Sequence, residues 1–141
     1  RVVFRSSEAG ARLVQGKIAV VAPCKAVRVH SDPEHIGRIV DNLINNALTY
    51  YSGRPDIRIE VRGGRSAAVR VIDNGLGIPA GLRDRIFERF FRVESSATLH
   101  SGTGLGLYIA RELAMGLGGA LVLQSSAPGR GSTFKLTLPL S

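Results

Sequence analysis

An amphipathic helix in the first half of the chain is the feature that most constrains the fold. Apolar residues recur along it at steps of three and four, so they form one buried stripe. The members of this stripe are Ile36, Ile39, Val40, Leu43, Ile44, Ala47 and Leu48. Ser31 or Asp32 can cap the helix, and Pro33 suits its first turn. We expect the helix to end near Tyr51, before Ser52-Gly53-Arg54-Pro55.

Sequence patterns typical of β-strands precede and follow this helix along the chain. Ile57, Ile59 and Val61 alternate with charged residues, which predicts a half-buried strand, and Gly63-Gly64 supplies a turn into the next one. The other predicted strands are Ile18–Ala22, Ala26–Val29, Ala67–Ile72, Ala120–Gln124 and Thr133–Leu138. The later predicted helices are Leu82–Phe87 and Leu107–Leu117, the second stopped by Gly118-Gly119. This order favours the α+β class: a two-layer α/β sandwich with a mixed, mostly antiparallel sheet and helices on one face.

The composition fits one globular domain and excludes several classes of protein. Apolar residues make up 44% of the 141 residues, which is enough for a single core. No stretch approaches the roughly eighteen apolar residues of a membrane span. Cys24 is the only cysteine, so an internal disulfide and a cysteine-based metal site are excluded. The net charge of +8 attracts polyanions in general, but the basic residues are scattered and aromatic residues are few, so we expect no nucleic-acid partner.

The N-terminal segment is expected to lie outside the main domain. Residues 1–16 are weakly patterned, and the chain starts without an initiator Met or the long apolar run of a signal peptide. We therefore expect a fragment in which residues 1–16 are the remnant of an upstream linker and residues 17–141 form the domain.

A row of polar side chains lies beside the apolar stripe of the first helix. Arg38, Asn42, Asn46 and Tyr50 are four residues apart and share one face, with Asn45 a little further round. Asparagine is a mediocre helix former, so three of them within five positions is a structural cost. An amide oxygen here can bind Mg²⁺, which needs few protein oxygens when nucleotide phosphates supply others. The alternative is a solvated polar face.

An acidic residue and two glycines follow a predicted strand in Asp73-x-Gly75-x-Gly77. Glycine lets the backbone approach a ligand closely, and a carboxylate fixed there can accept a hydrogen bond from the exocyclic amine of adenine. The alternative is an ordinary turn. The stretch through Ala80 also satisfies a dinucleotide fingerprint, but Pro79 lies inside it and no βαβ unit surrounds it, so we reject that interpretation.

Glycines also open the later long helix, in Gly102-Thr103-Gly104-Leu105-Gly106. Exposed backbone N–H groups and the helix dipole favour an anion at such a start. No Lys follows the last glycine, so this is not a Walker A loop. The alternative is a flexible loop that precedes a helix. Glu94–Thr103 is polar and lacks periodicity, which predicts a mobile loop.

The order of these motifs resembles the Bergerat ATP-binding fold, and specifically the histidine protein kinases. The motifs are similar to that family's N box (Asn42–Asn46), G1 box (Asp73–Gly77), F box (Phe87–Phe91) and G2 box (Gly102–Gly106). The end of the chain agrees, with Gly129-x-Gly131-Ser132-Thr133-Phe134. The resemblance covers roughly residues 17 to 140.

The resemblance implies a site for ATP and Mg²⁺. Asn46 would ligate Mg²⁺, Asn42 would support the phosphates or the metal, and Asp73 would accept the adenine amine. Tyr50 would pack near the adenine, and residues 92–103 would form a lid. The implied catalytic residues are Asn42 and Asn46. The implied nucleotide contacts are Asn42, Asn46, Tyr50, Asp73, Gly75, Gly77, Ile78, Arg89, Arg92, Gly102, Thr103, Gly104, Leu105 and Gly106.

Some positions leave alternatives open. Arg89 and Arg92 could reach phosphate oxygens through their planar guanidinium groups, and a solvated basic face is the alternative for both. Phe87 and Phe90 are expected to pack at the hinge of the lid. Thr49 stands where the family often has Lys or Arg, so a cation near the phosphates is missing and nucleotide affinity could be lower.

The residue types favour a kinase over a hydrolase. Related gyrase-type and mismatch-repair ATPases typically carry Glu where this helix has Asn42, and a neutral amide cannot accept the proton of an attacking water at pH 7. A neutral imidazole is already a nucleophile. None of the three histidines, His30, His35 and His100, has the sequence context of a phosphoacceptor. The resemblance therefore implies an acceptor histidine on an upstream segment that this chain lacks.

The resemblance also implies partners and a compartment. The partners would be ATP, the upstream dimerisation and histidine phosphotransfer helices of the same protein, and a response regulator. The full-length protein would be a homodimer and the isolated domain a monomer. The domain would be cytoplasmic, and an inner-membrane anchor of the parent protein is left open. The alternatives are an anti-sigma serine kinase or an ATPase of the same fold, and a degenerate nucleotide-binding module, to which Thr49 lends slight support.

Replacing Asn46 tests the metal assignment. Asn46→Ala removes the amide oxygen assigned to Mg²⁺, so magnesium should strengthen ATP binding less in the variant than in the parent chain. Calorimetric titration of ATP with and without magnesium measures the difference. An unaltered magnesium dependence would count against the metal role.

Overall fold

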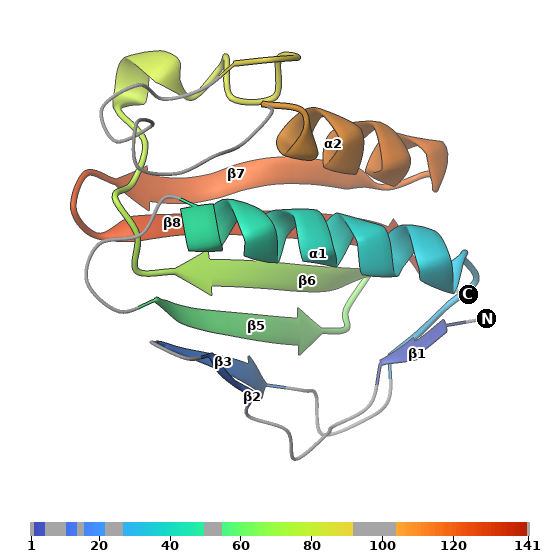
Figure 1. The fold of residues 1–141 in the computed structure, drawn as a ribbon. Coiled ribbons are helices and arrows are strands. Elements are labelled where there is room, and N and C mark those ends of the chain that lie inside the picture. The colour runs from blue at the N-terminus through green and yellow to red at the C-terminus, as the bar shows by residue number, and fades with distance from the viewer. Residues whose placement is uncertain are drawn as a thin grey trace.

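The computed structural model describes residues 2–4, 11–13, 16–21, 27–49, 55–91 and 104–140. The elements in chain order are β1 (Val2–Phe4), β2 (Ala11–Leu13), β3 (Gly16–Val21), β4 (Val27–Val29), α1 (Pro33–Thr49), β5 (Asp56–Arg62), β6 (Ser66–Asp73), the 3₁₀ helix η1 (Ala80–Leu82), α2 (Gly106–Gly116), β7 (Ala120–Ala127) and β8 (Gly131–Pro139). Both α-helices lie on the same face of one sheet (Figure 1).

Six strands form this sheet, in the order β2-β3-β5-β6-β8-β7. Strands β3 and β5 are parallel, and the other neighbouring pairs are antiparallel. Strands β1 and β4 form a separate antiparallel pair. The arrangement confirms the predicted α+β class, with a mixed, mostly antiparallel sheet and helices on one face. The predicted hairpin across Gly63-Gly64 is also confirmed, because β5 and β6 pair antiparallel.

The core lies between the sheet and the helices and follows the predicted periodicities. Ile57, Ile59 and Val61 of β5 are buried, whereas the residues between them are more exposed. Phe134 of β8 is only 1% exposed, and the ring of Phe87 packs edge-on against it with 6.2 Å between the centroids. Burying side chains of this size contributes about 1.5–3 kcal/mol each. The sheet therefore provides a packed base for the segments above it.

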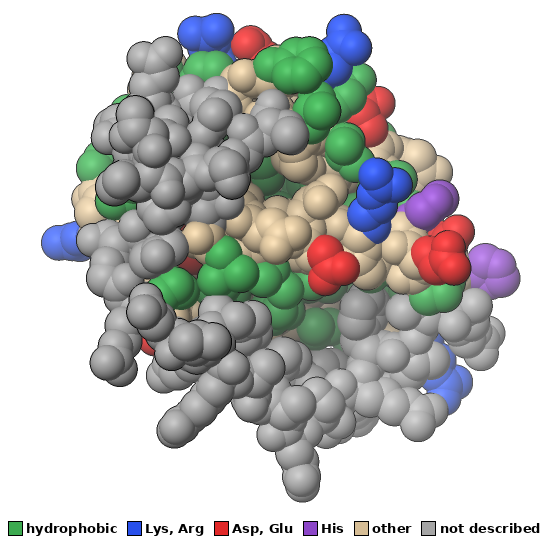
Figure 2. Space-filling model, viewed as in Figure 1, with side chains coloured by type: hydrophobic (Ala, Val, Ile, Leu, Met, Phe, Trp, Pro, Cys, Tyr) green, Lys and Arg blue, Asp and Glu red, His purple; other side chains and the backbone are tan. Residues whose placement is uncertain are grey.

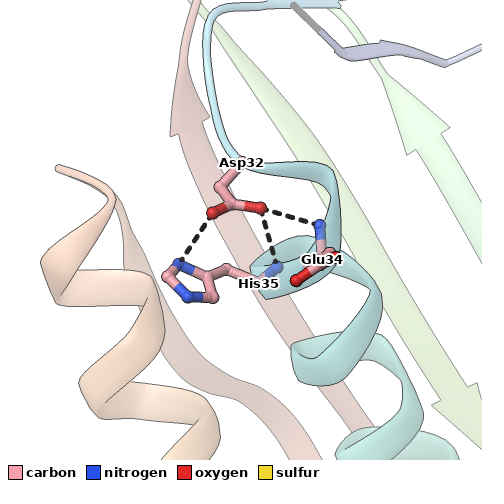
Figure 3. A network of polar contacts seen from close by, with 3 residues as sticks. All are labelled: Asp32, Glu34 and His35. Carbon is pink, nitrogen blue, oxygen red and sulfur yellow. Dashed lines mark hydrogen bonds and ion pairs between the residues drawn. The ribbon is translucent and has the colours of Figure 1, made fainter.

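Asp32 caps the start of α1 (Figure 3). Its Oδ1 accepts the backbone N–H of Glu34 at 2.9 Å and that of His35 at 3.4 Å. These donors have no partner inside the helix, which is why a capping carboxylate stabilises it. The other carboxylate oxygen lies 3.6 Å from His35 Nδ1. The helix extends to Thr49, and its predicted end near Tyr51 lies outside the described residues.

Glycines end α2, as the sequence predicts. Gly118 has a φ of +78° and donates its N–H to Met115 O at 3.0 Å. Gly119 donates to Ala114 O at 2.9 Å, which completes a Schellman motif. Ala110 and Ala114 are fully buried, and their small side chains let α2 lie close to α1 and β7.

The prediction of a short helix over Leu82–Phe87 is wrong. One turn of 3₁₀ helix covers residues 80–82, and separate turns continue to residue 90. The backbone bonds run to the residue three positions earlier, from Leu82 to Pro79, from Arg85 to Leu82 and from Glu88 to Arg85, at 2.9–3.0 Å. An α-helix would bond four positions earlier. Burial of Ile86 in the core keeps these turns against the sheet and helices.

The segment expected to be a linker contributes two short strands. Strand β1 pairs with β4, and β2 pairs with β3. The division into a linker over residues 1–16 and a domain over residues 17–141 stays a prediction. Within the described part of the chain, no helix combines the length and the apolar character that crossing a membrane requires.

Candidate functional site

The elements that carry the predicted motifs meet on one side of the sheet (Figure 1). The C-terminal half of α1 carries Asn42 and Asn46, strand β6 ends at Asp73, and α2 begins at Gly106. Helix α1 packs against both α2 and β6. The structure therefore brings the amide row, the carboxylate and the glycine-rich helix start to one region of the molecule.

The face that bears the two helices is hollowed near this region. Figure 2 shows a recess with hydrophobic side chains at its floor, beside a tan band in which backbone and uncharged polar side chains are drawn alike. A recess with an apolar floor and a few polar groups is the usual form of a small-molecule site.

Asp73 is a partly buried carboxylate with one oxygen already bonded. Its Oδ1 accepts the N–H of Gly75 at 2.9 Å and the N–H of Ser132 at 3.1 Å. Burial raises the pKa of Asp73 above its usual value, although the bonds from these two N–H groups act in the opposite direction. Among the described residues both bonds go to Oδ1, so Oδ2 is left for a donor on a ligand.

Two glycines let other backbone segments approach the loop after Asp73. Gly77 has a φ of +73°, and a Cβ there would overlap with the carbonyl oxygen of Ala127. Gly131 has a φ of +90°, and a Cβ there would overlap with the carbonyl oxygen of Asp73. Only glycine combines this backbone conformation with such a close approach. The loop therefore packs directly against the turn between β7 and β8.

Gly104 contacts Phe90, so the residues on either side of the predicted lid meet. The N–H of Phe90 donates to Gly104 O at 2.9 Å, and both residues have left-handed φ values, +64° and +74°. A Cβ on Gly104 would lie 2.7 Å from the Cα of Phe90. Phe90 is 68% exposed, so the expected packing of this residue is wrong and its backbone makes the contact instead. Arg92, Gly102 and Thr103 lie outside the described residues.

Helix α1 directs an amide donor into the interior. The side-chain nitrogen of Asn42 is buried and has no hydrogen-bond partner among the described residues. A buried donor without a partner is costly, so this atom fits a phosphate oxygen or a bound water. Asn46 lies half-buried one turn further along α1. The side chain of Thr49 and all of Tyr50 lie outside the described residues.

Arg89 stacks on an aromatic ring at the first turn of α2. Its guanidinium carbon lies 5.6 Å from the ring centroid of Tyr108, within the range of a cation–π interaction. Two further pairs lie near it, Arg85 over Phe91 at 4.8 Å and Arg111 over Phe87 at 5.0 Å. The expected packing of Phe87 is confirmed by its contacts with Arg111 and Phe134. Arg89 therefore lies beside the helix start to which we assign phosphates.

The start of α2 offers backbone donors for an anion. Leu105 is the N-cap residue, and among the described residues no side chain caps the first turn. A Cβ added at Gly106 would meet no atom within 4 Å among the described residues. Open space and N–H groups without a capping side chain both fit the predicted phosphate contact.

The structure adds one residue that no sequence motif indicated. Ser126 Oγ accepts the N–H of Ile78 at 2.8 Å and lies 2.8 Å from Ser132 Oγ. An irregularity in β7 turns Ser126 toward these partners, and strict alternation along the strand would have selected Ser125 instead. No signal in the sequence reports this irregularity.

Fold and site together define a class of ATP-binding domains. Residues 31–141 match the family described as histidine kinase-, DNA gyrase B-, and HSP90-like ATPase. The matched range contains α1, the Asp73 loop and the start of α2. The chain therefore belongs to this family.

Within the family, the chain is similar to sensor histidine kinases. It is 35% identical over 121 residues to the sensor protein kinase WalK of Staphylococcus aureus, and the match covers 83% of this chain. The chain spans 29% of the length of one WalK sequence and 20% of the others. Similar solved structures are the mycobacterial sensor histidine kinase MprB and the catalytic domain of histidine kinase ThkA in a nucleotide-free form.

Both solved structures overlap most of the chain. For MprB the TM-score is 0.77 at 29% identity, covering 89% of this chain and 84% of that one. For ThkA the TM-score is 0.74 at 26% identity, covering 89% of this chain and 80% of that one. The fold predicted from the motifs is therefore that of known histidine kinase catalytic domains.

Gly131→Ala should destabilise the domain more than Gly129→Ala. Both glycines have left-handed φ values, so each alanine carries a backbone cost of about 1–2 kcal/mol. A Cβ at position 131 would also overlap with the Asp73 carbonyl, whereas a Cβ at position 129 would meet no atom within 4 Å. We expect Gly131→Ala to lower the free energy of unfolding by about 1–3 kcal/mol more than Gly129→Ala. Denaturant titration measures both losses, and equal losses would contradict the close approach.

Asp73→Asn should stabilise the nucleotide-free domain at neutral pH. Because its pKa is raised, the folded protein binds this proton more tightly than the unfolded chain does. Stability therefore falls as the pH rises from the ordinary aspartate value to the folded value, and the ionised carboxylate remains a cost above that window. The neutral amide avoids this cost and keeps an oxygen for both N–H groups.

Melting temperatures measured from pH 3 to pH 8 would test whether ionisation of Asp73 destabilises the nucleotide-free domain. The difference between Asp73→Asn and the parent chain should appear as the pH rises and persist at pH 8. A variant that melts below the parent at neutral pH would show that the ionised carboxylate stabilises the free fold.

Proposed function

We propose that this chain binds Mg-ATP and transfers its γ-phosphoryl group to a histidine on an upstream helical segment of the same protein. It would thus be the catalytic domain of a two-component sensor histidine kinase. The single observation that carries the proposal is the Asp73 carboxylate, which is partly buried and has one oxygen left for a ligand at the end of β6.

Adenine recognition follows from that carboxylate. An exocyclic amine donates a hydrogen bond, and an ionised carboxylate accepts but does not donate. A partly desolvated acceptor discriminates strongly between bases, because a base with a carbonyl at this position would leave the oxygen facing another acceptor. Gly77 and Ile78 continue the same loop and would lie against the base.

Phosphate and metal binding rest on α1 and the start of α2. The buried side-chain nitrogen of Asn42 is a donor that fits a phosphate oxygen. Asn46, one turn away, can supply an oxygen to Mg²⁺, which accepts one or two protein ligands besides phosphates and waters. Arg89 beside Tyr108 and the N–H groups of α2 add positive potential for the phosphates.

A histidine acceptor is favoured over water by the residue at position 42. An amide there cannot act as the general base that a hydrolase needs. Positioning and electrostatic stabilisation carry most of the barrier reduction in phosphoryl transfer. His30 is exposed, and His35 lies beside Asp32 at the far end of α1 from Asn46, so neither serves as an acceptor in this site. The proposed partners are therefore the upstream phosphotransfer helices, a second copy of the full protein and a response regulator.

A transfer experiment in trans tests the function. The chain is mixed with the upstream helical segment of its parent protein and ATP labelled in the γ-phosphate. We expect acid-labile, base-stable phosphate on a histidine of that segment. Phosphate on serine would support a serine kinase, release of inorganic phosphate without an acceptor would support an ATPase, and binding without transfer would support a degenerate module.

Nucleotide-binding measurements test the assignment of Asp73 to adenine, with a matched control variant. Asp73→Asn should weaken Mg-ATP binding at least about tenfold and reduce the preference for ATP over GTP. Asp84→Asn changes an exposed aspartate in the turns after η1 and should leave both quantities unchanged. Equal ATP affinity in Asp73→Asn and the parent chain would remove the adenine assignment.

A further inference from the structure

A β-bulge in β7 determines which of its two serines, Ser125 or Ser126, faces the interior. Leu123 pairs with Phe134, Ser125 pairs with Thr133, and Gln124 is the extra residue between them. A bulge shifts the alternation of side chains by one position. As a result Ser126 lies opposite Ser132 on the side that faces the helices, and Ser125 is exposed.

The Ser126 hydroxyl bonds to two segments of the nucleotide site at once. It accepts the N–H of Ile78 at 2.8 Å and lies 2.8 Å from the hydroxyl of Ser132, with Gly131 O at 3.3 Å as a further acceptor. Ile78 is 8% exposed and Ser132 is 7% exposed, so these groups are largely removed from water. A buried N–H that loses its acceptor is costly.

The same residue has a fourth partner through its backbone carbonyl. The guanidinium of Arg83, in the turns after η1, donates from Nη2 to the Ser126 carbonyl. Ser132 in turn donates its own N–H to Asp73 Oδ1 at 3.1 Å. Ser126 is therefore at the centre of a set of bonds that joins the turns after η1, the loop after Asp73 and the start of β8.

We propose that Ser126 is a positioning residue for adenine recognition: its hydroxyl fixes Ile78 and Ser132, and through them the orientation of the Asp73 carboxylate. This proposal rests on the proposed function only for the identity of the base. The hydroxyl is required because it accepts from Ile78 and also forms a hydrogen bond with the Ser132 hydroxyl, and an apolar side chain of similar size can do neither.

The proposal is tested with Ser126→Ala and its matched control Ser125→Ala. Each removes one hydroxyl from neighbouring positions of β7, and only the first removes the acceptor of Ile78. Kd is measured for Mg-ATP and for Mg-ITP, whose base carries a carbonyl oxygen in place of the amine. Ser126→Ala should weaken Mg-ATP binding about tenfold and Mg-ITP binding less than about twofold. The preference for Mg-ATP over Mg-ITP should therefore fall at least about fivefold. Ser125→Ala should leave the ratio unchanged.

Hydrogen exchange gives a second readout that needs no nucleotide. In Ser126→Ala the Ile78 amide should exchange about tenfold faster, whereas the Leu136 amide in the core of β8 keeps its protection. Ser126→Thr keeps the hydroxyl and should restore both the exchange rate and the nucleotide ratio. If Ser126→Ala does not fold, Ser126→Cys provides a side chain of similar size with a much weaker acceptor, and it should show the same changes.

The outcomes separate the two proposals. Loss of affinity for both nucleotides in equal measure, an equal effect in Ser125→Ala, or unchanged exchange at Ile78 would each overturn the role of Ser126. A parent chain that binds Mg-ATP and Mg-ITP equally would overturn the adenine assignment instead, and exchange at Ile78 would then decide the role of Ser126 by itself.

Discussion

The partly buried carboxylate of Asp73 is the constraint on which the site depends. Removing a charge from water is unfavourable, and only directed donors offset it. Here those donors are the N–H groups of Gly75 and Ser132, which come from segments far apart in the chain. Their convergence requires β6 and β8 to be neighbours and Gly131 to lack a side chain. The position of the Asp73 carboxylate therefore depends both on the strand pairing and on the glycine turn.

Much of the fold follows from periodicity because its main elements bury one face each. The stripe of α1 and the alternation of β5 produce their burial patterns directly. The segment Leu82–Phe87 was predicted as a helix but forms turns. Leu82 and Ile86 do have helical spacing, yet spacing does not report which carbonyl an N–H selects. The parallel pairing of β3 with β5 also escapes local patterns, since it depends on contacts between distant segments.

The site was predictable where its chemistry is local. Asp73 and the glycines after it form a short motif, and Asn42 and Asn46 share a helix face. The rest arises from tertiary structure. Ser126 faces inward only because of a bulge, and Phe90 adopts a left-handed φ that is rare for a bulky residue. Arg89 meets Tyr108 only once the turns after η1 lie beside α2.

The backbone contact between Phe90 and Gly104 has a consequence for how this domain can vary among relatives. Because the residues flanking positions 92–103 are already joined, the entropy of closing that loop grows only with the logarithm of its length. Doubling the loop would cost about 0.6 kcal/mol. The fold can thus accept insertions or deletions between Phe90 and Gly104 without losing its core, so the length of the chain between them is free to vary while the Asp73 loop stays fixed.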